Sequence, residues 1–219
     1  MKTRDRIKNA AIEMFNDKGA TNVSTVQLSE SLKISPGNLY YYFDNKEHLI
    51  RSIFTEDIIP NTDMLFFRED FGHSENGILN FFEDYLNKIY QYRFFYAEPY
   101  ALLKNDPEML EIYKPRCDKL INQLKTVFDN WIATGIIEEI DQMTKNFIAD
   151  NIWTVGQTWP NFFRVVAGIE DPVRVNHEGV LHAYAIIAPY LTDAAHDRML
   201  VLLEKKGILE EYDLSDLEK

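Results

Sequence analysis

The sequence predicts an all-α fold, in which a three-helix head with a helix-turn-helix (residues 1–54) precedes a helical body (residues 55–219). Apolar residues recur at the spacing of helices that bury one side through most of the chain. No segment alternates convincingly with the period of two that strands show. Between positions 24 and 46, two short helical patterns stand a few residues apart, as in a helix-turn-helix.

The first predicted helix spans residues 4–18 and buries a single stripe. Gly19 follows it and ends the helix. The stripe consists of Ile7, Ala10, Ala11, Met14 and Phe15.

The second predicted helix begins at Ser24, because Ser24 and Gln27 have the spacing of a capping box. Ser35 caps the third helix, and Pro36 suits its first position, where the amide hydrogen that proline lacks would be unpaired anyway. We expect the second helix to turn three apolar side chains inward: Val26, Leu28 and Leu32.

The third helix has an apolar side and a polar side. Leu39 and Phe43 are four residues apart and share the face that anchors the helix. The outward face is left to Gly37, Asn38, Tyr40 and Tyr41. Two helices joined at a steep angle are the geometry that places the second one in a DNA major groove.

The run GNLYYYF followed by NKEHLI resembles the recognition helix and the next helix start of tetracycline-repressor (TetR) family regulators. The preceding run IKNAAIEMFNDKGA is similar to the first helix of that family, with Phe15, Gly19 and Thr25 at the expected positions. The resemblance covers about the first 50 residues. Two positions differ: Lys33 stands where the family usually has glycine, and Ser29 where it usually has alanine. Because a lysine with positive φ is strained, we expect a slightly altered turn.

The resemblance implies a DNA-binding head, residues 1–54, and an effector-binding and dimerisation body, residues 55–219. Residues 92–103 with Asp106 and Pro107 also resemble one subgroup of these repressors. The residues expected at DNA are Ser24, Thr25, Val26, Gln27, Ser35, Pro36, Gly37, Asn38, Tyr40, Tyr41, Tyr42 and Lys46. By resemblance, five of them meet phosphates: Ser24, Thr25, Tyr40, Tyr41 and Lys46.

The composition of the third helix predicts which bases it reads. It has no arginine for the common bidentate contact to guanine, and Asn38 is suited to adenine. Pro36 and Gly37 allow a close approach to thymine methyl groups, and Gln27 is placed to read a flanking base. We therefore expect half-sites that lean to A·T at the centre of the contact.

The net charge of −12 would by itself argue against a nucleic-acid partner. The charges are unevenly distributed, however. The head carries eight Lys and Arg against six Asp and Glu, a net of +2, which leaves −14 for the body. This asymmetry indicates that only the head approaches DNA.

The body is predicted to be a series of helices. The fourth helix, residues 46–59, connects head and body and is closed by Pro60. After a polar loop at 72–77 comes a helix with Ile78 to Ile89 on its apolar face. Prolines 99, 107 and 115 divide the next stretch into a short helix, a turn and a long helix bent near Pro115, which ends at Gly135. The remaining expected helices are 141–166, 176–191 and 193–206, before a frayed acidic end at 210–219.

The helices at 141–166 and 176–191 have apolar side chains on more than one face. A second copy packed as a four-helix bundle accounts for this, and the resemblance implies the same homodimer. The alternative is a helix sandwiched inside a monomer. The residues predicted at the dimer interface are Ile152, Tyr184, Ile187 and Leu191.

Aromatic residues are frequent in the body, and most of them are expected in its core. As a set they also fit an apolar cavity between helices, and the resemblance implies a small apolar or aromatic effector in this domain. The residues predicted at this effector are Tyr96, Tyr100, Cys117, Trp153, Trp159 and Phe163. Cys117, the single cysteine, also fits as a small core residue and allows no disulfide.

No catalytic residue, metal site or cofactor is expected. His177 and His182 are five apart and do not share a helix face, and no glycine-rich phosphate loop occurs. No apolar run could span a bilayer and no leader is apparent, so we expect a soluble, cytoplasmic protein that does not engage membranes.

The sequence thus predicts a ligand-responsive repressor that binds a near-palindromic, double-stranded DNA operator as a homodimer. The main alternative is a small-molecule carrier whose head no longer binds DNA, because Asp44 is acidic and residues 35–45 contain no Arg or Lys. A helical enzyme is the third reading.

Overall fold

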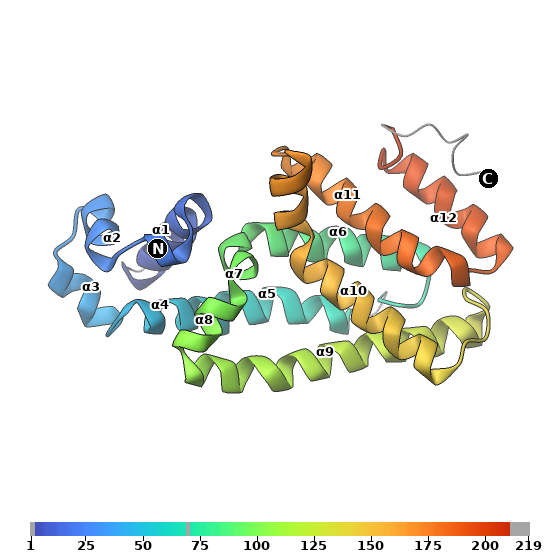
Figure 1. The fold of residues 1–219 in the computed structure, drawn as a ribbon, viewed down its shortest axis with the longest axis horizontal. Coiled ribbons are helices and arrows are strands. Elements are labelled where there is room, and N and C mark those ends of the chain that lie inside the picture. Colours follow the sequence, from blue (N-terminus) through green and yellow to red (C-terminus); the bar gives the residue numbers. More distant parts are fainter. Residues whose placement is uncertain (1–2, 69–70, 211–219) are drawn as a thin grey trace. The chain divides into compact units, whose positions relative to one another are not determined.

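The computed structural model describes residues 3–68 and 71–210 (Figure 1). Every regular element in these residues is helical, and the pairing of Ile137 with Leu191 is an isolated bridge rather than a strand. The predicted all-α fold is confirmed. No helix in the described ranges is long and apolar enough to cross a membrane.

The chain divides into two compact units. Unit 1 comprises Met1–Asp63 and Lys88–Arg116, and unit 2 comprises Met64–Asn87 and Cys117–Lys219. Two of the three dividing points fall within helices, namely α6 (Glu75–Gln91) and α9 (Pro107–Thr134). The predicted boundary at residue 54 is a division by function and stays a prediction.

Unit 1 begins with the three helices of the head. These are α1 (Thr3–Lys18), α2 (Thr25–Leu32) and α3 (Pro36–Tyr42), with a short 3-10 turn at Ala20–Asn22. Their core is fully buried and contains Ile7, Ala11, Phe15, Leu28, Leu39 and Phe43. The prediction that Val26 turns inward is wrong, since this side chain is 50% exposed. Val26 lies in the first turn of α2, whereas Leu28 of the same helix is 1% exposed.

The fourth helix is longer than predicted. The helix α4 (Lys46–Ile53) continues through a π-helical turn (Phe54–Ile58) into α5 (Ile59–Asp63), so Pro60 does not close it. In the π turn the amide of Ile59 donates to the carbonyl of Phe54, five residues back. Pro60 follows in the first turn of α5, where a missing amide hydrogen is tolerated.

The rest of unit 1 consists of α7 (Arg93–Ala97), α8 (Pro99–Asn105) and the start of α9. Phe94 packs on Phe15 of α1 with ring centroids 5.3 Å apart, and Phe95 stacks on Phe54 at 4.9 Å. The predicted turn before Pro107 is confirmed. Asp106 caps α9 there by accepting a hydrogen bond from the amide of Met109 at 3.1 Å.

Unit 2 contains a 3-10 turn (Met64–Phe67), most of α6 and α9, and three further helices. These are α10 (Gln142–Phe162), α11 (Pro172–Ile187) and α12 (Asp193–Lys205). A π turn (Phe163–Ala167) follows α10 and a 3-10 turn (Ala188–Tyr190) follows α11. The structure starts α11 four residues earlier than predicted, because Asp171 caps it and Pro172 occupies its first turn.

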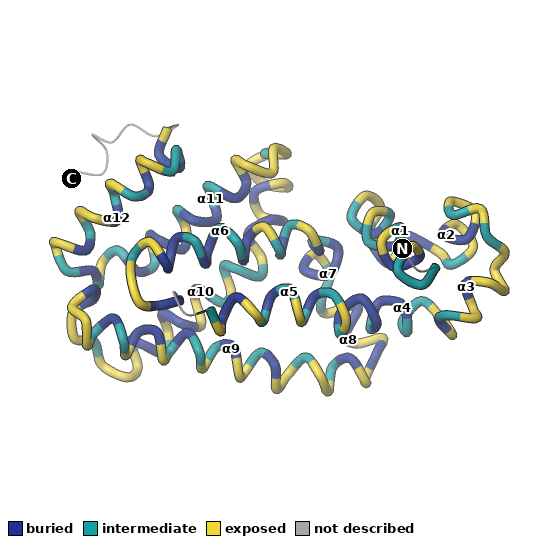
Figure 2. Tube along the Cα trace, turned by 180° about the vertical axis from the view of Figure 1, so that it is seen from behind, coloured by how far each residue is buried: buried dark blue, intermediate teal, exposed yellow. Residues whose placement is uncertain are grey.

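The core of unit 2 is aromatic. Phe66, Phe71, Phe81 and Tyr85 contact one another, the closest pair being Phe71 and Phe81 with centroids 4.2 Å apart. Figure 2 shows how α9 and α10 alternate buried and exposed positions at helical spacing. Pro115 lies inside α9, which continues through it. The predicted frayed end falls outside the described residues beyond Glu210.

Candidate functional site

Local hydrogen bonds define the two helices at residues 25–42. The hydroxyl of Ser24 accepts from the amide of Gln27 at 3.2 Å, and the Gln27 side chain accepts from the amide of Ser24 at 2.8 Å. The hydroxyl of Ser35 accepts from the amide of Asn38 at 3.2 Å. Both predicted caps are confirmed. Between the helices, Lys33 adopts φ 55° and ψ 41°, as the glycine-like position requires.

The outer face of α3 is open to solvent. Leu39 and Phe43 are buried behind it, whereas Tyr40 is 46% and Tyr41 81% exposed. The hydroxyls of Thr25 and Tyr40 lie 3.0 Å apart and link the start of α2 to α3. Of the twelve residues predicted at DNA, nine are exposed and three are half-buried: Thr25, Tyr42 and Lys46.

The ammonium group of Lys46 has partners that the sequence did not reveal. It donates to the carbonyls of Ala20 at 2.9 Å, Val23 at 3.2 Å and Thr21 at 3.4 Å. Lys46 therefore holds the chain between α1 and α2 against the start of α4. To contact a phosphate as predicted, the ammonium group must give up its hydrogen bond to one of these carbonyls.

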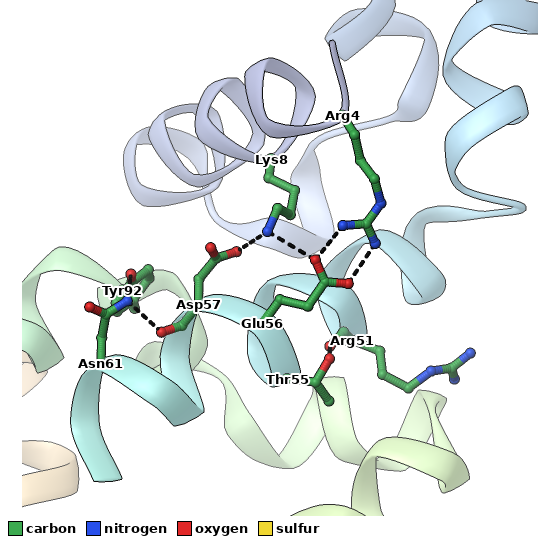
Figure 3. A network of polar contacts seen from close by, with 8 residues as sticks. All are labelled: Arg4, Lys8, Arg51, Thr55, Glu56, Asp57, Asn61 and Tyr92. Atoms are coloured by element: carbon green, nitrogen blue, oxygen red, sulfur yellow. Dashed lines mark hydrogen bonds and ion pairs between the residues drawn. The ribbon is translucent and has the colours of Figure 1, made fainter. Parts of the chain in front are cut away.

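Ion pairs join α1 to the π turn after α4 (Figure 3). The guanidinium of Arg4 forms two hydrogen bonds to the carboxylate of Glu56, one of them 2.6 Å long. Lys8 is 5% exposed and donates to Glu56 at 3.1 Å and to Asp57 at 2.8 Å. We call Arg4, Lys8, Glu56 and Asp57 the α1 clamp. Its hydrogen bond from Arg4 lowers the pKa of Glu56 to about 2.

The helix α4 carries a second ion pair. Arg51 of α4 donates to both oxygens of Asp106, at 2.6 and 2.8 Å, and Asp106 is itself 4% exposed. Sequence reasoning missed this pair and the α1 clamp. The only local signal was the four-residue spacing of Arg4 and Lys8, which places both on one side of α1.

Unit 2 contains a small, partly open apolar cavity of about 20 Å³. Its walls include Phe66, Phe81, Phe82 and Tyr85 on one side and Trp153 on another. No charged side chain of the described residues lines it.

The six residues predicted at the effector do not come together around this cavity. Trp153 lines it, and Trp159 packs beside it against Gly179. Phe163 is buried and Cys117 half-buried in unit 2. Tyr96 is buried in unit 1, and Tyr100, also in unit 1, is 78% exposed.

The four residues predicted at the dimer interface lie in the core of one copy. Ile152, Tyr184, Ile187 and Leu191 are each at most 8% exposed. Helical periodicity identified two apolar faces on these helices but could not tell which one faces inward. The large apolar side chains that are exposed on α10, the following π turn and α11 are Met143, Phe147, Phe162, Val165, Val166 and Val173.

Two capped helices, a tight turn and an exposed polar face on the second helix define a helix-turn-helix protein of the DNA-binding class. A family model described as bacterial regulatory proteins of the tetR family matches residues 7–53, and one described as bacterial transcriptional repressor matches residues 67–199. The chain belongs to the TetR family and is a DNA-binding transcriptional regulator.

Individual relatives agree with this assignment. A TetR-family transcriptional regulator from Marinobacter aquaeolei VT8 superimposes with a TM-score of 0.85 at 30% identity, over 94% of this chain and 98% of that one. The regulator UidR of Escherichia coli K12 is 46% identical over 55 residues, 25% of this chain and 28% of its own length. IcaR of Staphylococcus epidermidis, a negative transcriptional regulator of the biofilm operon icaADBC, is 28% identical over 107 residues, 49% of this chain and 56% of its own.

Proposed function

We propose that this TetR-family regulator is a repressor that binds a near-palindromic operator as a homodimer and releases it when a small molecule binds unit 2. The observation that carries the proposal is the outer face of α3. It presents hydroxyl, amide and ring groups to solvent on a helix anchored from behind by Leu39 and Phe43. No catalytic step is part of the proposal, and such a repressor acts in the cytoplasm.

The groups proposed to contact DNA, on α3 and at the start of α2, are of two kinds: some position the protein and others read the bases. The hydroxyls of Ser24, Thr25, Tyr40 and Tyr41 suit phosphate oxygens, which fix the register of a protein on DNA without reading its sequence. Asn38 is exposed in the first turn of α3 and suits the major-groove edge of adenine. Half-sites that lean to A·T follow from this arrangement.

A route for the effector signal is available within α6. Its residues Phe81, Phe82 and Tyr85 line the cavity, and the helix continues to Gln91. There the side-chain amide of Asn16, in α1, donates to the carbonyl of Gln91 at 2.9 Å and accepts from the amide of Phe94 at 3.0 Å. A ligand that shifts α6 thereby acts on α1. It releases DNA only if it binds more tightly to the conformation of the protein that does not fit DNA.

Selection of binding sites from random double-stranded DNA tests this function. We expect enrichment of a near-palindrome whose half-site centres lie about 34 to 36 Å apart or somewhat wider, as two symmetric heads require. A protein that enriches no sequence, yet binds small molecules, would be the carrier considered above.

A further inference from the structure

The turn between α1 and α2 contains a backbone amide that its own helix does not satisfy. Residues Ala20–Asn22 form a 3-10 helix, and Ser24, which caps α2, lies two residues after it. Thr21 is in the first turn of this short helix, where an amide has no acceptor within the helix. The side chains of Ala20 and Val23, before and after it in the chain, are at most 1% exposed. An acceptor for the Thr21 amide must therefore come from elsewhere.

Glu98 supplies this acceptor from 77 residues further along the chain. Its carboxylate accepts from the amide of Thr21 at 3.2 Å and from the hydroxyl of Thr21 at 3.0 Å, with one oxygen for each donor. The carbonyl of Thr21 in turn accepts from the ammonium group of Lys46 at 3.4 Å. A carboxylate and an ammonium group from two other segments of unit 1 thus hold the same residue of the turn.

The backbone of Glu98 is itself held in place. Glu98 lies at the break between α7 and α8, with φ −139° and ψ 43°. A proline disfavours helical backbone in the residue before it, and Pro99 occupies the first turn of α8. The carbonyl of Glu98 accepts from the amide of Leu102 at 3.2 Å. The carboxylate therefore reaches the turn from a backbone position that local structure fixes.

We propose that Glu98 is a positioning residue for DNA binding, because it fixes the turn that precedes α2. The inference rests on the proposed function, in which Ser24 and Thr25 contact phosphates. These two residues lie three and four positions after Thr21, so a displaced turn moves their hydroxyls relative to α3. A carboxylate has no attraction for phosphate, so Glu98 acts through Thr21 and not on DNA itself.

The charge of Glu98 and its positioning role predict effects of opposite sign. Removal of a negative charge by itself strengthens DNA binding, since phosphates repel that charge. Loss of the hydrogen bonds weakens binding, because the start of α2 is no longer held where it fits the phosphates. Glu98→Ala removes both the charge and the hydrogen bonds, whereas Glu98→Gln removes only the charge. A glutamine oxygen accepts from the Thr21 amide, and its NH2 group donates to the Thr21 hydroxyl, which serves as donor or acceptor.

Operator affinity of the full-length protein, measured by fluorescence anisotropy on the selected operator, tests the proposal. We expect Glu98→Ala to weaken binding by about five- to tenfold, and Glu98→Gln to stay within about twofold of wild type. Glu111→Gln is the charge control. Glu111 is exposed on α9 in the same unit and has no hydrogen bond or ion pair among the described residues. This variant should bind as tightly as wild type or slightly more tightly.

A double-mutant cycle with Thr21→Val identifies the partner of Glu98. Thr21→Val removes the hydroxyl and should weaken operator binding by about two- to fivefold in the wild-type background, but not in the Glu98→Ala background. Circular dichroism confirms that the variants are folded at the temperature of the binding assay. Thr21→Val alone tests the same contact should Glu98→Ala fail to fold.

Hydrogen exchange followed by mass spectrometry, without DNA, measures the turn directly. Amides of residues 19–28 should exchange faster in Glu98→Ala than in wild type, and at the wild-type rate in Glu111→Gln. Unchanged exchange in Glu98→Ala would show that Glu98 does not hold the turn and would overturn the proposal.

Three results of the binding assays would also overturn it. These are operator binding by Glu98→Ala that is unchanged or tighter, equal weakening by Glu98→Ala and Glu98→Gln, and a Thr21→Val effect that is the same in both backgrounds. Each of them leaves the proposed function intact, because wild type still binds its operator. A wild-type protein that enriches no operator would instead refute the proposed function, and the role of Glu98 in DNA binding with it.

Discussion

At the scale of single residues, Lys46 shows how one side chain serves two purposes. Its ammonium group bridges three backbone carbonyls between α1 and α2, and its contact with a phosphate stays a prediction. Both roles need a positive charge at the start of α4. The carbonyl oxygens and a phosphate oxygen would compete for the same three N–H donors of the ammonium group.

We predict that Lys46→Ala weakens binding to specific and random DNA alike. The slope of log affinity against log salt should fall by roughly one unit per head, since one phosphate contact is lost. The loss of the carbonyl contacts should also lower the free energy of unfolding by about 1 to 2 kcal/mol. Fluorescence anisotropy at several salt concentrations and urea denaturation measure the two effects. A reduced stability with an unchanged salt slope would show that Lys46 only holds the turn.

The sequence predicts residue roles well where the partners are near in the chain. The caps at Ser24 and Ser35 depend on atoms three residues away, and both are present. The carbonyl partners of Lys46 lie 23 to 26 residues away and were not foreseen. Tyr100 was assigned to a cavity because it is aromatic, yet composition contains no information on which side of α8 faces solvent.

At the scale of elements, the α1 clamp fixes the first helix to the π turn that follows α4. The extra residue of a π turn changes which way the following side chains point, and Glu56 and Asp57 lie inside it. The sequence predicted a helix here but placed its end at Pro60, because proline normally stops a helix. A π turn has no signature in composition or spacing, so neither the continuation nor the clamp could be predicted.

We predict that Glu56→Gln destabilises the protein at neutral pH and loses this effect in acid. The pKa of Glu56 is lowered from 4.5 to about 2, so its contribution is present above about 4.5 and is lost as the pH falls toward 2. The effect should be about 1 kcal/mol, because the side chain is 41% exposed and water screens the pair. Urea denaturation between pH 7 and pH 3 measures it, with Glu30→Gln as the control. An equal difference between wild type and Glu56→Gln at all pH values would contradict the clamp.

At the scale of the whole molecule, the uncovered apolar side chains on α10 and the π turn after it are candidates for the contact between two copies. Phe147 is 61%, Phe162 50% and Val165 82% exposed. Periodicity correctly indicated that α10 has a second apolar face. The residues predicted at the dimer interface, however, lie in the core of one copy: Ile152, Tyr184, Ile187 and Leu191. A single sequence does not say which face packs inward, because that depends on helices distant in the chain.

We predict that Phe147→Asp combined with Phe162→Asp yields a folded monomer, since paired charges would face each other across a dry interface. Ile187→Asp should instead unfold the protein, because Ile187 is 2% exposed within one copy. Sedimentation velocity and circular dichroism distinguish the two results. A double variant that remains dimeric would place the interface on another face.

We propose that the outer face of α3 reads operator sequence, and Asn38→Ala tests this role most directly. On the selected operator and on a set of single base-pair substitutions, the variant should lose discrimination of about 1 to 3 kcal/mol at one A·T pair in each half-site. Discrimination at the other positions should be kept. Tyr41→Phe is the control from the same helix, and it should weaken binding to all sequences equally if its hydroxyl meets phosphate as we propose. An Asn38→Ala protein that keeps the wild-type preference at every base pair would contradict the claim.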